Sequence, residues 1–182
     1  MATCSSLAAL AALLGAAAFA EAKVFLTQEE ALKLAFPGAA VERKTIFLTE
    51  AEQKEVQALS GGPAPSALAV AYVALKDGKL AGTAYFDTHV VRTQQETLLV
   101  AVGPEGAVFR IEVLSFSEPE EYLPREHWYG QFRGRKLDDD LAISRGIRAV
   151  SGATLTARAT TEAARRVLAL HAVLARRAKK AA

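Results

Sequence analysis

Four segments with the composition of β-strands follow one another in the middle of the chain, and short turns join them in pairs. The first two, 67–76 and 80–91, are joined by Asp77-Gly78, a dipeptide typical of tight hairpin turns. The second two, 97–102 and 107–116, are joined by a four-residue turn with glycine at both ends. Strands joined by tight turns run antiparallel, so this stretch predicts an antiparallel sheet.

A long helix is predicted after the sheet. From Thr156 to about Arg177, small and apolar residues recur at helical spacing. His171 falls on this apolar stripe, which favours a position in the core or at its edge. The 182 residues are 51% hydrophobic and suffice for one domain with a core. The fold class that follows is α+β, with an antiparallel sheet packed against a long C-terminal helix.

Local signals divide the remaining chain. The capping boxes Thr27–Glu30 and Thr49–Glu52 each predict the start of a helix, and β-branched residues between them predict a strand from Val41 to Leu48. The stretch 117–141 is polar, contains prolines and glycines, and is expected to be irregular. A loop of this length inside a small domain is often functional.

The first twenty residues resemble an export signal. An uncharged apolar run ends in Ala18-Phe19-Ala20, a pattern of small residues typical of signal-peptidase cleavage. We therefore predict a signal peptide over 1–20, an N-terminal helical and strand extension over 21–66, a main domain over 67–182, and a periplasmic or other extracytoplasmic location. An uncleaved anchor, which would associate the protein with a membrane, and a buried helix are the alternatives for the first segment.

Charge is distributed unevenly along the chain. From Leu141 onward there are nine Lys and Arg residues and one acid, Glu162, which leaves 13 of the 22 basic and 19 of the 20 acidic residues before that point. A basic helix can bind nucleic acid, but an exported protein seldom meets it, so no nucleic-acid partner is expected. A solvated helix face or a docking surface for an acidic partner or an anionic cofactor remain as interpretations.

Common catalytic and metal-binding patterns are missing from the sequence. The only cysteine, Cys4, lies in the predicted signal, and the three histidines form no ligand motif, so no metal site is predicted. The acidic run 138–140 is interpreted as a solvated turn. No catalytic residue is assigned.

The segment Val150-Ser151-Gly152-Ala153-Thr154-Leu155-Thr156 directly precedes the predicted long helix. Small residues allow a ligand to approach the backbone closely, and the N-terminus of a helix favours a phosphate group. A simpler reading is that Thr154 or Thr156 is the N-cap of the helix.

The sequence SGATLT before an amphipathic helix resembles the FMN-binding domain family, which includes the C subunit of the sodium-translocating NADH:quinone oxidoreductase and the G subunit of the Rnf complex. In that family FMN is joined through its phosphate to the threonine of the motif by a dedicated flavin transferase. The resemblance implies that Thr154 is the acceptor and that its neighbours in the motif, Ser151, Gly152, Ala153, Leu155 and Thr156, shape the cofactor site.

The resemblance extends over roughly residues 67–175. The segment VLSFSEPEEYLP occupies the place of a family loop beside the flavin, which implies contacts from Glu118, Pro119 and Tyr122 and a cover over the ring from Trp128. Ordinary packing is the other interpretation for the two aromatic residues. Three residues before Ser151 the family usually has an acid, whereas this chain has Arg148. Arg148 could weaken recognition by the transferase or pair with the flavin phosphate.

These features together predict an exported electron-transfer flavoprotein with FMN covalently bound at Thr154. Its expected partners are a flavin transferase and redox proteins such as cytochromes or quinone oxidoreductase subunits. An FMN-containing redox sensor and a flavin-free interaction domain that kept the fold are the alternative functions.

Overall fold

Two tight hairpins form the centre of the structure. The computed structural model describes residues 23–181, and the predicted signal segment 1–20, with Cys4, lies outside them. Asp77 and Gly78 adopt φ of 51° and 74°, the left-handed values that a two-residue hairpin turn requires. They join β3 (Leu68–Lys76) to β4 (Lys79–Val90), and the second hairpin joins β5 (Gln95–Val102) to β6 (Val108–Phe116).

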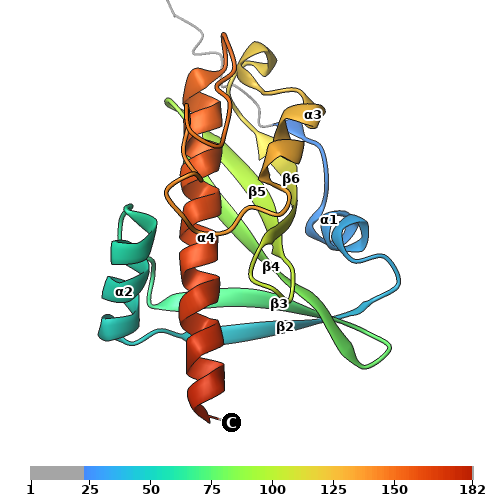
Figure 1. Cartoon of the computed structure of the whole chain (residues 1–182). Coiled ribbons are helices and arrows are strands. Elements are labelled where there is room, and N and C mark those ends of the chain that lie inside the picture. Colours follow the sequence, from blue (N-terminus) through green and yellow to red (C-terminus); the bar gives the residue numbers. More distant parts are fainter. Residues whose placement is uncertain (1–22, 182) are drawn as a thin grey trace, which may run out of the picture.

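Two further strands complete a six-stranded sheet in the order β1-β6-β5-β4-β3-β2 (Figure 1). The short β1 (Lys23–Val24) pairs with the end of β6, and β2 (Ala40–Phe47) pairs with β3 along its whole length. Every neighbouring pair is antiparallel. The predicted α+β fold with an antiparallel sheet is therefore confirmed.

The helices cover both faces of this sheet. Their bounds are α1 (Gln28–Ala35), α2 (Glu50–Ser60), α3 (Glu126–Tyr129) and α4 (Thr154–Ala181), with single 3-10 turns η1 (Glu120–Tyr122) and η2 (Gly130–Phe132). Both predicted capping boxes are present, at Thr27–Glu30 and at Thr49–Glu52. The long helix α4 runs across one face of the sheet, as predicted (Figure 1). None of the helices in the described part of the chain combines the length and apolar character needed to span a membrane.

The main core lies between α4 and the sheet. Alanines of α4 pack with Val167 and Leu168 against inward-facing residues of β4, β5 and β6. Trp128 and Phe132, from the irregular segment after β6, join the same cluster. Small side chains let the helix axis approach the sheet closely, so α4 is held in a defined position along its length.

The opposite face of the sheet is covered by α1. Ala31, Ala35 and Phe36 pack there against Ala84 and other sheet residues. A smaller cluster joins α2 to the far half of α4 through Val56, Ala169 and Val173. In β6, Val108 and Ile111 both face α4, because register shifts in the β5–β6 ladder interrupt the alternation of side chains.

Candidate functional site

The SGAT segment forms a tight turn that leads into α4. The backbone N–H of Ala153 donates to the carbonyl of Val150 at 3.1 Å. Gly152 has φ of +83°, a conformation that costs a residue with a Cβ atom about 1 kcal/mol or more. No atom lies within 4 Å of where a Cβ would stand, so glycine is required here by backbone conformation and not by space.

Thr154 is the first residue of α4, and its side chain is exposed. Its Oγ1 donates a hydrogen bond to the Val150 carbonyl, 3.0 Å away, and so points back toward the turn. The helix begins two residues before the predicted Thr156. Thr154 is therefore not an N-cap residue, because it lies inside the helix and its hydroxyl bonds to the preceding turn.

The start of α4 lacks the side-chain cap that the other two main helices have. Ala153, the residue before the helix, has no polar side-chain atom. Within residues 23–181, no side chain accepts a hydrogen bond from the N–H groups of Thr154, Leu155 or Thr156. By contrast, α1 and α2 both begin with complete capping boxes. The first turn of α4 thus presents N–H donors to an external acceptor.

Thr156 is placed quite differently from Thr154. It is only 1% exposed, and its Oγ1 donates to the carbonyl of Tyr122 at 2.6 Å. This bond fastens the η1 segment to the first turn of α4. Of the two threonines considered from the sequence, only Thr154 presents its hydroxyl to solvent.

Glu118 holds the turn between β4 and β5 close to the η1 segment and the start of α4. One carboxylate oxygen accepts the backbone N–H groups of Arg92, Thr93 and Gln94, at 3.2, 2.7 and 2.9 Å. Burial opposes ionisation of this side chain, but the hydrogen bonds from the backbone outweigh it and hold the pKa of Glu118 below its ordinary value. The turn between β4 and β5 is therefore fixed beside the loop that follows β6.

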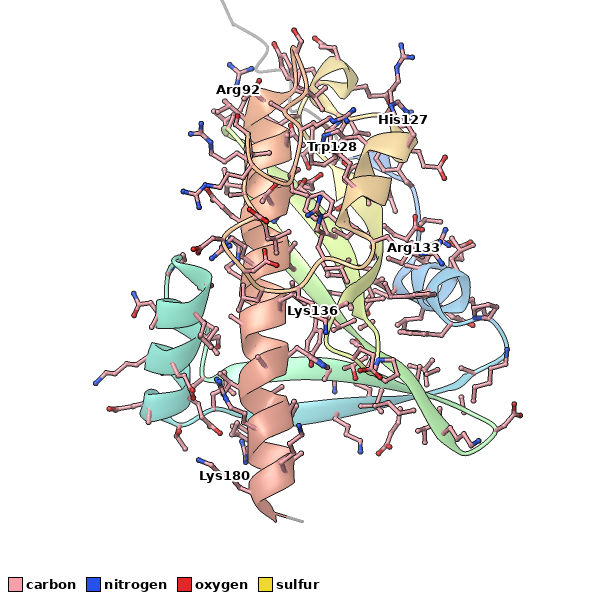
Figure 2. The ribbon with its side chains drawn as sticks, viewed as in Figure 1. Arg92, His127, Trp128, Arg133, Lys136 and Lys180 are labelled. Carbon is pink, nitrogen blue, oxygen red and sulfur yellow. The ribbon has the colours of Figure 1, made fainter. Side chains whose placement is uncertain are left out.

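These contacts enclose a shallow pocket of about 170 Å³ at the start of α4. Its lining residues are Arg92, Tyr122, Gly152, Ala153, Thr154, Leu155 and Thr156. The Arg92 guanidinium stacks over the Tyr122 ring, with its carbon 4.8 Å from the ring centroid. Figure 2 shows Arg92 beside the end of α4 that carries this pocket.

Arg92 was missed by the sequence analysis. It lies 62 positions before Thr154 in the sequence, inside a turn with no motif of its own. Only the pairing of the strands and the bonds to Glu118 bring it to the pocket. A basic residue in a short turn next to a predicted strand was the one signal available.

Trp128 lies in the core and not over the pocket of Thr154. It is 5% exposed, packs edge-on against Tyr129 and Phe132, and donates from Nε1 to the carbonyl of Arg148 at 2.7 Å. Together with Arg148 and Ser151 it lines a separate hollow of about 570 Å³. The structure thus brings Arg92, and not Arg148, into the pocket with Thr154.

Arg148 and Pro119 are exposed residues. The backbone of Arg148 is bonded on both sides, to Trp128 and to the Gln131 side chain, while its own side chain is directed to solvent. Pro119 precedes η1, and its carbonyl accepts the backbone N–H of Tyr122 at 2.9 Å. At both positions the hydrogen bonds are made by backbone atoms and not by the side chain.

A buried cluster of ionisable side chains lies between the sheet and α4. His89 is hydrogen-bonded to Asp87 through Nδ1 at 2.8 Å and to Glu96 through Nε2 at 3.0 Å. Arg166 of α4 makes two bonds to Asp87, and Thr160 of the same helix donates to Glu96 at 3.4 Å. These bonds fix α4 against β4 and β5.

The charge state of this cluster follows from its contacts. Burial disfavours the charged imidazole, but hydrogen bonds to Asp87 and Glu96 raise the pKa of His89 to about 9. Burial raises the pKa of Glu96, whose side chain is fully enclosed. His171, on the apolar stripe as predicted, pairs with the Tyr85 hydroxyl at 3.0 Å, and burial lowers its pKa.

The acidic run 138–140, interpreted as a solvated turn, forms a turn in which Asp138 accepts the N–H groups of Asp140 and Leu141. Separately, within residues 23–181 no three or more His, Cys, Asp or Glu side chains are arranged so that they could hold a metal ion.

The comparisons with known proteins fit this geometry. Residues 93–169 match the family model described as an FMN-binding domain. No curated protein and no solved structure matches the chain. The matched segment contains Glu118, Tyr122 and the SGAT turn with Thr154, all of which meet at one end of α4. Residues 93–169 therefore resemble an FMN-binding domain, and the residues that meet at the start of α4 lie within the part of the chain that carries this resemblance.

Proposed function

We propose that this protein carries FMN attached through its phosphate to Oγ1 of Thr154 and uses the flavin to transfer electrons. The observation that carries the proposal is the start of α4. An exposed hydroxyl stands there beside first-turn N–H groups that no described side chain caps. A phosphate on Oγ1 would supply the acceptor that these N–H groups lack.

The residues of the pocket suit an anion of this kind. Its lining includes the Arg92 cation and the first turn of α4, and no carboxylate lines it. Its volume of about 170 Å³ is smaller than the roughly 300 Å³ at which ligand pockets begin. The pocket therefore suits the phosphate end of FMN, and the ring system must extend beyond it.

Attachment needs a donor and an enzyme that the chain does not provide. The Thr154 oxygen forms a P–O bond to the flavin phosphate, and the pyrophosphate bond of a flavin dinucleotide donor breaks. A nucleoside monophosphate leaves, the hydroxyl loses its proton, and no electron is transferred. The Val150 carbonyl, which accepts the hydroxyl hydrogen bond, orients the oxygen for this reaction.

A covalent tether suits a protein that works outside the cytoplasm, where free FMN is not supplied. The tether makes retention of the flavin intramolecular, so a weakly held ring stays with its protein. Flavin accepts one or two electrons, and the protein positions it and tunes its potential. We propose an extracytoplasmic redox carrier that exchanges electrons with cytochromes or quinone oxidoreductase subunits, after maturation by a flavin transferase.

The attachment site is tested by denaturing the protein after co-expression with a flavin transferase. The wild type is expected to gain the mass of FMN minus water and to remain fluorescent after denaturation. Thr154→Ala is expected to lose the added mass completely, and Thr154→Ser to keep at least part of it, because it retains a hydroxyl at the same place.

Thr156→Val is the matched control. It removes the hydroxyl that holds Tyr122 and should destabilise the fold by about 1 to 2 kcal/mol, yet it should still gain the flavin. A full mass gain in Thr154→Ala, or none in the wild type, would refute attachment at Thr154.

A further inference from the structure

Arg92 lines the pocket of Thr154, although the two residues lie 62 positions apart in the sequence. It follows β4, and Thr154 begins α4. Its guanidinium forms no ion pair with a carboxylate of the described residues and makes one stacking contact, with the Tyr122 ring. The stacked group keeps its N–H donors free at its edge.

The backbone of Arg92 is held by the Glu118 carboxylate. Three consecutive N–H groups, from Arg92 to Gln94, converge on one oxygen of Glu118, and the Thr93 hydroxyl donates to the same oxygen at 3.3 Å. Glu118 itself is buried. The hydrogen bonds of the Glu118 carboxylate are therefore made to the turn formed by residues 92–94.

Tyr122 completes the arrangement. Its carbonyl accepts the Thr156 hydroxyl bond from α4, while its ring supports Arg92. The position of the guanidinium relative to Thr154 is thus set from two sides, by Glu118 through the backbone and by Tyr122 through the ring.

We propose that Arg92 binds the phosphate of the flavin attached at Thr154, and that Glu118 and Tyr122 position Arg92 for that contact. This inference rests on the proposed function. It assigns Glu118 and Tyr122 a positioning role and gives the phosphate contact to a residue outside the SGAT motif. A guanidinium matches a phosphate because its parallel N–H donors can engage two oxygens at once.

The first test measures the rate of flavin attachment with a limiting amount of transferase. Arg92→Gln is expected to slow attachment about tenfold, the usual effect of losing one charge-assisted hydrogen bond. Arg158→Gln makes the same change of charge on an exposed residue of α4 that does not line the pocket, and it should load at the wild-type rate. Arg92→Lys should lie between the two, because it keeps the charge and loses the stacked fork.

The second test observes the phosphate itself in the loaded protein. The ³¹P resonance of the phosphodiester should move in Arg92→Gln and stay in place in Arg158→Gln. Slow loading, or a failure to load with thermal unfolding unchanged, supports the proposal, as does a moved resonance. Wild-type loading together with an unmoved resonance overturns it.

A double-mutant cycle tests the role of Glu118. If Glu118 acts through Arg92, Glu118→Ala should slow attachment as Arg92→Gln does, and the double variant should be no slower than Arg92→Gln. Glu118→Gln keeps an oxygen that can accept the turn N–H groups and should recover part of the rate. Additive losses would show that Glu118 supports the fold and does not position Arg92.

These results remain separable from the proposed function. If the wild type gains no flavin mass, attachment at Thr154 is wrong. If the wild type and Arg92→Gln load equally and show the same ³¹P resonance, attachment stands and the role of Arg92 is wrong.

Discussion

At the scale of single residues, His89 links two carboxylates that would otherwise repel each other. It lies between Asp87 and Glu96, with its side chain 10% exposed. The two hydrogen bonds favour the imidazolium more than burial disfavours it, so His89 has a pKa of about 9 when folded, against about 6.5 in the unfolded chain. Its contribution to stability is then fully present below about pH 6.5 and is lost as the pH rises through about 9.

We therefore predict that the free energy of unfolding of the wild type falls by up to about 3 kcal/mol between about pH 6.5 and 9 because of His89. His89→Gln should remove most of this slope, as measured by urea denaturation across that range. His171→Gln should keep the slope, because burial lowers the pKa of His171 and confines its titration to lower pH. Identical slopes in wild type and His89→Gln would mean that His89 is neutral in the folded protein.

The predictability of the site also differs from residue to residue. Thr154 could be identified from the sequence, because its motif is contiguous and precedes a helical pattern. Arg92 could not, because its position depends on the β4–β5 turn and on a carboxylate 26 residues away. Trp128 was ambiguous, since an aromatic residue in a loop can cover a ligand or fill a core, and the hydrogen bond to Arg148 that places it is not visible in the sequence.

At the scale of elements, the end of α1 packs so closely against β4 that no side chain fits between them. The ring of Phe36, the residue after α1, lies over Gly82 of β4. A Cβ at position 82 would stand 2.8 Å from that ring and 2.7 Å from the carbonyl oxygen of Val102. Glycine is needed at position 82 because the Phe36 ring and the Val102 carbonyl lie too close to leave room for a side chain.

Gly82→Ala is accordingly expected to displace Phe36 and to lower the free energy of unfolding by about 1 to 3 kcal/mol, as overpacking does. Hydrogen exchange should accelerate in α1 before it does in α4. Gly130→Ala is the control, because no atom lies within 4 Å of its added Cβ and its φ of −57° suits alanine. Unchanged stability in Gly82→Ala would show that α1 adjusts without cost.

Elements were predictable where their signals are local. Capping boxes and the Asp77-Gly78 turn lie within four consecutive residues, and the structure has them where expected. The bulges of the β5–β6 ladder depend on pairing between strands, so the sequence of β6 alone does not show that Val108 and Ile111 share a face. The helix begins at Thr154 and not at Thr156, because the carbonyl of Ala153 already accepts the N–H of Ala157 at 2.9 Å.

At the scale of the whole molecule, residues before 67 contribute to the same sheet and core as residues 93–169, which match the family model. β2 pairs with all of β3, and Val56 of α2 covers Ala169 and Val173 of α4. Arg165 of α4 also reaches back to the carbonyl of Ser60 at 3.1 Å. The matched segment 93–169 is therefore embedded in a larger folding unit.

We predict that the fragment 67–182 does not unfold cooperatively, whereas the fragment 23–182 does. Removing β2 and α2 uncovers the edge of β3 and a strip of α4. Thermal unfolding followed by circular dichroism measures the difference. A sharp transition in the shorter fragment would show that it folds independently.

The single continuous helix α4 also separates two ends of the molecule. Its 28 residues span about 40 Å, with Thr154 at one extremity and the basic residues Lys179 and Lys180 at the other. Figure 2 shows Lys180 at the C-terminal end of the helix. A flavin on Thr154 would exchange electrons only with a protein that approaches the first extremity, since tunnelling falls off steeply with distance. The exposed side chains of Lys179 and Lys180 at the second extremity lie too far away to take part in that exchange.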